Sequence, residues 1–419
     1  EHAVGFDKVK DLIRPFTPET VSKRCGIAAD DIRQMARDFS AASSACIHAR
    51  MGTCTQEFGT LSSWLPDVIH YATGNLDKEG GVMFPLPAHG GGTTKGTPGV
   101  GRGIKFGRHH SRVSNRPEIL GELPAACMAE EIETLGEGQI RAMITIAGNP
   151  ILSTVESDRL TKAFESLEFM ISLDPYLNET TCHADVILPG PSPLEIPHFD
   201  MSFAQLSIQN HARYSPPVFD KSPDQPYEWQ TLLRLVGLFS GMGANADIAA
   251  VDNFVLQTAI EREARLDTSP IYGSDPQTIL DTLAPRVGTE RMIDFLLRTG
   301  PYGEGFGKNP DGLTLEKLEA HPHGIPFGAM KPRIPEVLRT PSGKIELAPE
   351  CIVSDMERLS SRLNNQENGL RLIGRRHLRS NNSWMHNSKR LVKGKLRCTL
   401  HRCNSNRFWD NMDSKNDNY

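Results

Sequence analysis

The chain has 419 residues, a formal net charge of −5 and 38% hydrophobic residues. This length suffices for two or three domains with substantial cores, and the composition is typical of a globular protein. The small net charge excludes an overall electrostatic signal for nucleic acid or a membrane surface. The best candidate for a membrane span begins at Leu232, but it is short and contains Arg234, whereas a span needs about 20 apolar residues.

The cysteines are scattered along the chain and form no C-x-x-C pair. They are Cys25, Cys46, Cys54, Cys127, Cys182, Cys351, Cys398 and Cys403. This pattern indicates a reducing compartment rather than a disulfide framework. We therefore expect a cytoplasmic protein in which most of these thiols are small buried side chains.

The first elements are predicted from capping signals and apolar spacing. Thr17 is a predicted N-cap followed by proline and glutamate, and this helix should stop near Gly26. A second helix is expected over residues 27–42, with an apolar stripe docked on a sheet. A strand over residues 44–50 and a helix over residues 61–74 should follow.

Three short apolar runs in the middle of the chain predict a sheet. After a loop rich in glycine and proline at residues 80–107, which we expect to cover a site or a ligand, the runs lie at residues 143–147, 169–173 and 184–188. They do not alternate with polar residues, and an amphipathic helix separates the first two. We therefore predict an α/β fold with a mainly parallel, Rossmann-like sheet between two layers of helices.

The remainder of the chain changes character near residue 332. Residues 216–302 have mostly helical periodicity, with helices expected at residues 229–239, 251–265, 276–283 and 290–297. Short extended segments follow, so a β-rich module should begin within residues 333–368.

Polar residues follow two of the predicted parallel strands. Gly148 and Asn149 follow the first strand, and Asp174 comes directly after Leu173 at the end of the second. Ligands of open parallel sheets bind outside these carboxyl ends, where glycine permits close approach and Asn or Asp can bind a phosphate, base or ribose. An equally weighted alternative is that Asn149 and Asp174 only form turns before proline.

These residues belong to a longer ordered set of motifs: G-N-P at 148–150, D-P-Y-L-N-E-T-x-x-x-A-D-V-I-L-P at 174–189, and Leu194-Glu195. The set resembles the molybdopterin oxidoreductase family, which includes formate dehydrogenases and periplasmic nitrate reductases. Further resembling segments lie at residues 16–39, 50–60, 72–81, 340–350 and 372–387. The resemblance covers roughly residues 15–397.

The resemblance implies binding of a bis(molybdopterin guanine dinucleotide) cofactor that carries molybdenum or tungsten. It implies cofactor contacts at Met51, Gln56, Gly148, Asn149, Leu173, Asp174, Glu195, Gly374, Arg375, Arg376, His377 and Ser383. Guanidinium groups suit the two phosphates because they donate paired hydrogen bonds to oxyanions. No catalytic residue or metal ligand is carried over, and electron-transfer subunits are implied as partners of the parent enzyme.

The resemblance also implies the domain divisions. Residues 1–332 should form the family's α/β region, residues 333–397 the start of a dinucleotide-binding β-barrel, and residues 398–419 a polar tail that cannot complete it.

Several departures from the family pattern lead us to expect a fragment. The family has an N-terminal segment with a 4Fe–4S cluster or related domain, followed by a metal-ligating residue, and this sequence contains no C-x-x-C-x-x-x-C run. Formate dehydrogenases have an arginine at about the position of His89, which puts formate as the substrate in doubt. Because the metal-ligating residue and the iron–sulfur segment are both missing from this sequence, we expect the chain alone to lack turnover.

Two alternatives to an oxidoreductase portion stay open. The chain could be a catalytically silent nucleotide-binding or assembly module. Residues 369–403 contain ten Lys or Arg and no acid, which is typical of a solvated basic face or a nucleic-acid patch. Given the other motifs, we prefer phosphate binding by Arg375 and Arg376 and expect no nucleic-acid partner. His321 and His323 have too few neighbouring ligands to predict a metal site.

Overall fold

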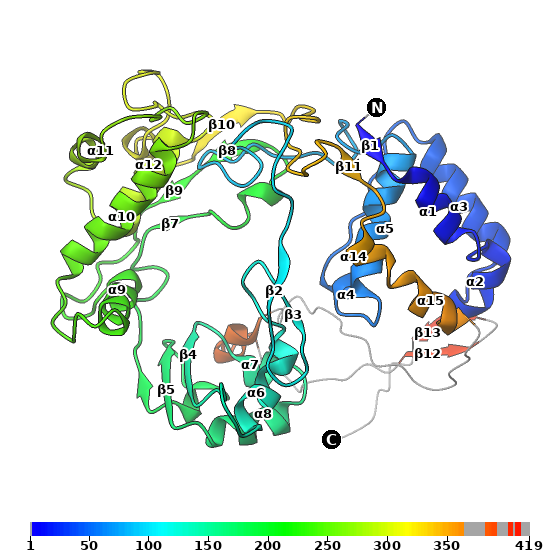
Figure 1. Cartoon of the computed structure of the whole chain (residues 1–419), viewed down its shortest axis with the longest axis horizontal. Helices are drawn as coiled ribbons and strands as arrows, with labels where there is room; N and C mark the ends of the chain where they lie inside the picture. Colours follow the sequence, from blue (N-terminus) through cyan, green and yellow to red (C-terminus); the bar gives the residue numbers. More distant parts are fainter. Residues whose placement is uncertain (1, 364–381, 392–400, 405–406, 412–419) are drawn as a thin grey trace. The chain divides into compact units, whose positions relative to one another are not determined.

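The computed structural model describes residues 2–363, 382–391, 401–404 and 407–411. The chain forms two compact units (Figure 1). Unit 1 comprises residues 1–84, 331–334 and 344–419, and unit 2 comprises residues 85–330 and 335–343. Unit 2 is thus inserted into the sequence of unit 1, and each unit is described by itself.

Unit 1 is mostly helical. Its helices are α1 (Phe6–Ile13), α2 (Pro18–Cys25), α3 (Ala29–Ala41), α4 (Met51–Cys54), α5 (Gly59–Ala72), α14 (Glu350–Val353), α15 (Met356–Leu363) and the 3₁₀ helix η4 (Ser383–Asn387). Its strands are β1 (Ala3–Val4), β11 (Ile345–Glu346), β12 (His401–Asn404) and β13 (Arg407–Asn411). Strand β1 pairs in parallel with β11, and β12 pairs antiparallel with β13.

Helix α5 carries the core of unit 1. The expected apolar stripe is confirmed, because Leu61, Trp64 and Val68 are all buried. They pack with Leu347 and Val353 from the distant end of the sequence. The indole Nε1 of Trp64 donates a buried hydrogen bond of 2.8 Å to the Leu347 carbonyl. Burial of these side chains and this hydrogen bond together hold α5 against residues 347–353 within unit 1.

The caps predicted for α2 are also confirmed. Thr17 accepts a hydrogen bond of 3.3 Å from the Thr20 amide, and Gly26 ends the helix with φ 69°. That conformation is unfavourable for residues with a Cβ atom, so glycine is suited to this C-cap.

Two predictions for unit 1 are wrong. Helix α3 has no buried residue and packs against α2 rather than on a sheet. No strand forms at residues 44–50. The Ala45 amide donates to the Asn75 side chain and the Ile47 amide donates to the His70 imidazole. Asn75, which follows α5, and His70, which lies within it, therefore accept backbone amides that a neighbouring strand would otherwise have bound.

Unit 2 contains the predicted parallel sheet and a helical part. Its helices are α6 (Met128–Glu133), α7 (Pro150–Ser153), α8 (Ser157–Glu165), α9 (Glu228–Phe239), α10 (Ile248–Ala264), α11 (Pro276–Leu283), α12 (Gly288–Thr299), α13 (Leu315–Glu319), and the 3₁₀ helices η1 (Ala125–Cys127), η2 (Thr181–His183) and η3 (Ala204–Leu206). Its strands are β2 (Phe106–His110), β3 (Pro117–Ile119), β4 (Ala142–Ile146), β5 (Phe169–Leu173), β6 (Val186–Ile187), β7 (His198–Phe199), β8 (Asn210–Ala212), β9 (Tyr214–Ser215) and β10 (Ile325–Gly328).

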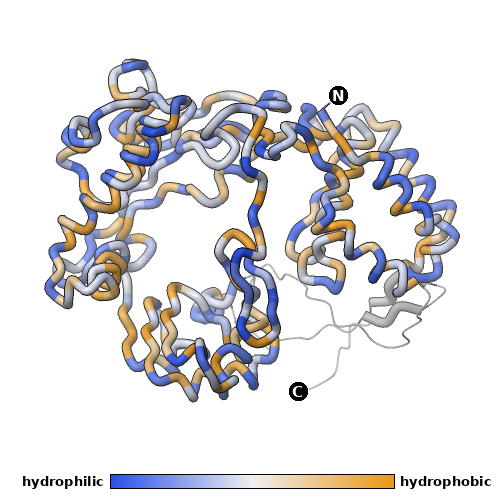
Figure 2. The backbone as a smooth tube through the Cα atoms, in the orientation of Figure 1, coloured by the Kyte–Doolittle hydropathy of each residue, from blue (hydrophilic) through white to orange (hydrophobic). Residues whose placement is uncertain are grey.

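The three central strands confirm the predicted strand–helix–strand unit. Strand β5 lies between β4 and β6, and both pairings are parallel. Met143 and Met170 are register partners, and their face packs on Leu160 and Phe164 of α8. In Figure 2 the strands are largely orange, which reflects their apolar residues.

The opposite face of the sheet differs from the prediction of two helical layers. Ile144 and Ile146 are 37% and 53% exposed, and the core cluster described at this sheet lies on the α8 side. Three antiparallel pairs, β2 with β3, β7 with β9 and β8 with β10, complete the strands of unit 2. Parallel strands flanked by helices are therefore present, while the expected second layer is not formed by the described residues of this unit.

The expected helical region is confirmed by α9 to α12, whose core includes Ile260, Leu283 and Phe295. Within the described residues, no helix has both the length and the apolar character needed to cross a bilayer. From residue 333 to residue 363 the structure has β11, α14 and α15. The next segment of the predicted barrel, residues 364–381, lies outside the described residues, so the barrel and the three domain divisions stay predictions.

The buried His70 side chain makes the stability of unit 1 depend on pH. Burial lowers the pKa of this imidazole below 6.5, although Asp67 acts in the opposite direction. Nε2 accepts the Ile47 amide at 2.8 Å, which requires that nitrogen to be unprotonated. The unfolded chain therefore takes up the proton first, and the free energy of unfolding should decrease as pH falls below 6.5, by at most about 1.4 kcal/mol per pH unit.

Urea denaturation of the wild type and of His70→Gln at several pH values between 8 and 5 checks this expectation, since glutamine can accept the amide without titrating. The variant should lose less stability on acidification. Equal losses in both proteins would contradict the role of His70.

Candidate functional site

The carboxyl ends of β4 and β5 lie side by side, as the sequence predicts. Ile146 and Leu173 are register partners, and the Ala147 amide donates a hydrogen bond of 2.9 Å to the Leu173 carbonyl. Asn149 and Asp174 follow these ends and are only 8% and 7% exposed. The parallel pairing therefore brings both predicted polar residues to one edge of the sheet.

Ala147 adopts a left-handed backbone conformation with φ 49° at this edge. A residue with a Cβ atom pays about 1–2 kcal/mol for that conformation. Gly148 follows, and a Cβ atom placed on it would meet nothing closer than 3.7 Å. The turn thus has local backbone strain, a feature often found at ligand sites, and its Gly148 backbone is not crowded by other atoms.

Asn149 is held by the loop that follows β5. Its Nδ2 donates to Glu179 Oε2 at 2.7 Å, and its Oδ1 accepts the Thr180 hydroxyl at 2.7 Å. Thr180 Oγ1 in turn accepts the Ile151 amide at 3.1 Å. Both ends of the Asn149 amide are therefore engaged within the protein, so this side chain fixes the position of the residue 175–181 loop.

Asp174 organises the start of the same loop. Its Oδ1 accepts the Tyr176 amide at 2.8 Å, and its Oδ2 accepts the Asn178 side-chain amide at 3.3 Å. This is the local turn that formed the alternative interpretation of Asp174. An ionised carboxylate has about four acceptor positions. The turn consequently leaves Asp174 with acceptor capacity for a ligand that donates hydrogen bonds.

The two other predicted side-chain contacts of unit 2, Leu173 and Glu195, differ in their capacity to contact a ligand. Leu173 as a whole is only 2% exposed and its carbonyl accepts the Ala147 amide, so this residue belongs to the core. Glu195 lies in a short turn, where its Oε2 accepts the Ser192 amide at 2.8 Å. That contact likewise occupies only part of the carboxylate.

The remaining predicted contacts belong to unit 1 or lie outside the described residues. Met51 begins α4 and is 51% exposed, and the Gln56 side chain donates to the Gly52 carbonyl at 2.9 Å. Ser383 begins η4. The segment Gly374, Arg375, Arg376 and His377 lies outside the described residues. The structure therefore brings together the strand-end residues of unit 2, and the other contacts stay predictions.

His89, for which the motif resemblance predicts an arginine in formate dehydrogenases, lies beside the Phe199 ring. Its ring lies 5.8 Å from the Phe199 ring in an edge-to-face arrangement, and its Nδ1 is buried without a hydrogen-bond partner among the described residues. Burial lowers the pKa of His89, although Asp200 acts in the opposite direction. At neutral pH the imidazole is accordingly uncharged, unlike an arginine. In the described part of the chain, no three His, Cys, Asp or Glu side chains form a group that could hold a metal ion.

Residues 33–224 match the molybdopterin oxidoreductase family model. This part of the chain, which contains the strand-end residues, is therefore a molybdopterin oxidoreductase domain, as the sequence motifs indicated.

The similar proteins include formate dehydrogenases and nitrate reductases. The F420-dependent formate dehydrogenase subunit alpha of Methanocaldococcus jannaschii is 28% identical over 194 residues, which cover 44% of this chain and 28% of that protein. Formate dehydrogenase H of Escherichia coli is 29% identical over 199 residues, covering 45% and 28% respectively. The assimilatory nitrate reductase catalytic subunit of Bacillus subtilis is 26% identical over 204 residues, covering 46% and 28%. The matched part of the chain thus spans less than a third of each relative.

Ala147, Glu179 and Thr180 were not predicted as site residues. Glu179 and Thr180 lie within the N-E-T part of the recognised motif, so their polar side chains beside a strand end were an available signal. Ala147 offered no such signal, because its backbone angle depends on the pairing of β4 with β5.

Replacing Ala147 with glycine should stabilise the protein. Glycine adopts φ 49° without the steric cost of Cβ, so the free energy of unfolding should rise by up to about 1 kcal/mol. Ala142→Gly is the matched control, because Ala142 lies in the regular part of β4, where glycine should destabilise by about 0.5–1 kcal/mol. Thermal and urea unfolding measure both changes. A lower stability of Ala147→Gly would contradict the assigned strain.

Proposed function

We propose that this chain contributes the molybdopterin guanine dinucleotide-binding portion of a molybdenum- or tungsten-dependent oxidoreductase related to formate dehydrogenases and nitrate reductases. The observation that carries the proposal is the strand-end edge of unit 2, where the amide of Ala147 in the strained turn donates to the carbonyl of Leu173, the residue directly before Asp174. The family match over residues 33–224 supports it independently.

The residues at this edge suit a guanine nucleotide. Guanine presents two neighbouring N–H donors, and the free acceptor positions of Asp174 can receive them. The absence of a Cβ atom on Gly148 allows a ligand to approach the backbone closely. Asn149 acts on the ligand indirectly, because its amide holds the loop that carries Glu179 and Thr180.

The phosphates of the cofactor are assigned to Arg375 and Arg376, and Met51, Gln56, Glu195, Gly374, His377 and Ser383 are kept as proposed contacts from the motif resemblance. When bound, the cofactor supplies the redox chemistry through its metal. The 419 residues alone are proposed not to turn over, because the sequence contains neither the iron–sulfur motif nor the metal ligand expected from the family. Electron-transfer subunits are proposed as partners of the whole enzyme.

Calorimetric titration with GDP tests the nucleotide part of the proposal. The wild type should bind GDP in preference to ADP, and Asp174→Asn should weaken GDP binding about tenfold, since a hydrogen bond to a charged group contributes about 1.5–3 kcal/mol. Asparagine retains an acceptor for the Tyr176 amide, so the turn should survive. Asp158→Asn is the matched control, because Asp158 is an exposed acid in the first turn of α8.

Absent GDP binding, or equal affinities of the wild type and Asp174→Asn, would refute the assigned nucleotide site. Protein expressed in a host that makes the cofactor should contain molybdopterin guanine dinucleotide after purification. Specific GDP binding without that cofactor would instead support the catalytically silent nucleotide-binding module.

A further inference from the structure

Unit 2 contains a concave site that is separate from the strand ends. It is a pocket of about 430 Å³, formed by the glycine-rich loop at residues 90–96, the segment at residues 266–270 and the segment at residues 298–309. This volume lies within the range of small-molecule sites. Among the described residues that line it, none is a proposed cofactor contact. The pocket consequently has no role in the function proposed above.

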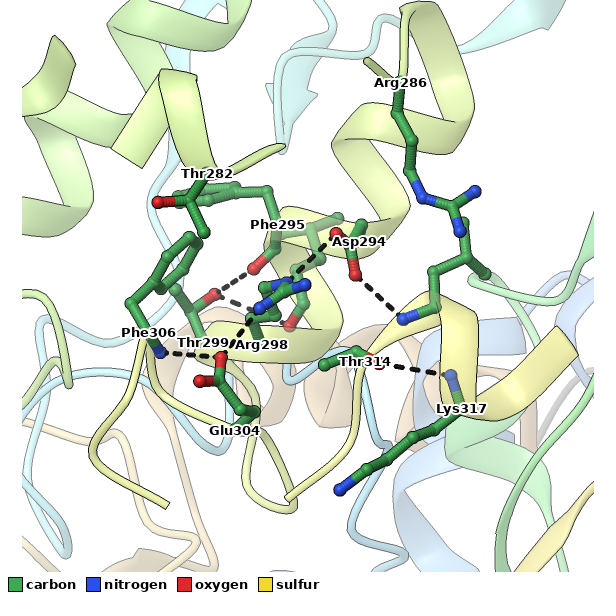
Figure 3. A network of polar contacts seen from close by, with 12 residues as sticks. Thr282, Arg286, Asp294, Phe295, Arg298, Thr299, Glu304, Phe306, Thr314 and Lys317 are labelled. Atoms are coloured by element: carbon green, nitrogen blue, oxygen red, sulfur yellow. Dashed lines mark hydrogen bonds and ion pairs between the residues drawn. The ribbon is translucent and has the colours of Figure 1, made fainter. Parts of the chain in front are cut away.

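Arg298 lies in the wall of this pocket, and Figure 3 shows its contacts with Asp294 and Glu304. Its Nε donates to Asp294 at 3.0 Å and its Nη1 donates to Glu304 at 2.8 Å. These carboxylates also accept backbone amides, Asp294 from Leu315 and Glu304 from Phe306. Nη2 has no hydrogen-bond partner among the described residues. Asp294 and Glu304 thus hold the guanidinium, the centre of the Phe306 ring lies 5.6 Å from its Cζ, and Nη2 retains free donors.

Two lysines add further donors to the same wall. Lys95 Nζ binds Glu263 at 2.8 Å, which occupies one of its three N–H groups. Lys308 has no ion pair or hydrogen bond among the described residues. Glu336, another acid of the wall, has partners of its own. The groups left free in the pocket are therefore mainly cationic N–H donors, which match the acceptor oxygens of a phosphate.

The rest of the lining indicates the organic part of the ligand. The pocket is much larger than a phosphate ion, and its wall includes the polar side chains of Ser269 and Asn309. No aromatic side chain lies among the described lining residues, so the pocket offers no ring on which a nucleotide base could stack. Hydroxyl and amide groups instead suit a polyol. We propose that this pocket binds a small sugar phosphate, with the phosphate at Arg298 and Lys308.

Glucose 6-phosphate is a suitable probe for calorimetry on the full chain. It should bind saturably, with inorganic phosphate weaker and glucose without measurable affinity. Lys308→Gln should weaken glucose 6-phosphate binding about tenfold or more, because it removes a charged hydrogen bond. Lys162→Gln, at an exposed position of α8 in the same unit, should leave the affinity unchanged. Thermal unfolding of both variants should match the wild type.

Three outcomes would overturn the proposal. They are no saturable binding of glucose 6-phosphate, equal affinity for inorganic phosphate, and unchanged affinity in Lys308→Gln. GDP titration of Lys308→Gln should still give the wild-type result, because the strand-end residues do not line this pocket. Failure of this proposal is thereby distinguishable from failure of the proposed function.

Discussion

The candidate site depends on the parallel pairing of β4 with β5. Parallel register places both strands' carboxyl ends at the same edge, and the hydrogen bond from the Ala147 amide to the Leu173 carbonyl extends the pairing one residue beyond β4. The chain must then turn sharply into α7, which it does through a left-handed alanine and Gly148. The core beneath, built on Met170, Leu160 and Phe164, is what holds this strained turn in place.

The loop after β5 shows how one set of polar residues can serve both structure and binding. Asn149 and Asp174 are nearly buried, and buried polar groups need hydrogen-bond partners. Asn149 has used both ends of its amide, while Asp174 retains free acceptor positions. Turn formation and ligand binding are therefore not competing explanations for Asp174. They are compatible because a carboxylate accepts more hydrogen bonds than its turn requires.

The strand-end edge and the pocket beside Arg298 differ in which charged groups remain unpaired. The strand-end edge presents the Asp174 carboxylate, which suits a base or ribose that donates hydrogen bonds. The pocket beside Arg298 presents free N–H groups because Asp294 and Glu304 bind that arginine and Glu263 binds Lys95. Counting charges alone would miss the free donors of the pocket, since acids and bases lie close together there. What distinguishes the sites is which donors and acceptors remain unpaired.

The sequence by itself determined the helices α2, α5 and α11, the strand β5 and the family that residues 33–224 match, because capping residues, apolar spacing and ordered motifs are local properties. It also identified Asn149 and Asp174 as strand-end residues. Tertiary structure decided that residues 44–50 form no strand, since Asn75 and His70 take their amides. It likewise decided that Asn149 is internally bonded and that Ala147 is strained. Those properties depend on partners as many as 31 residues away, as for the Asn149–Thr180 bond, and no local pattern specifies which of the available donors and acceptors will meet.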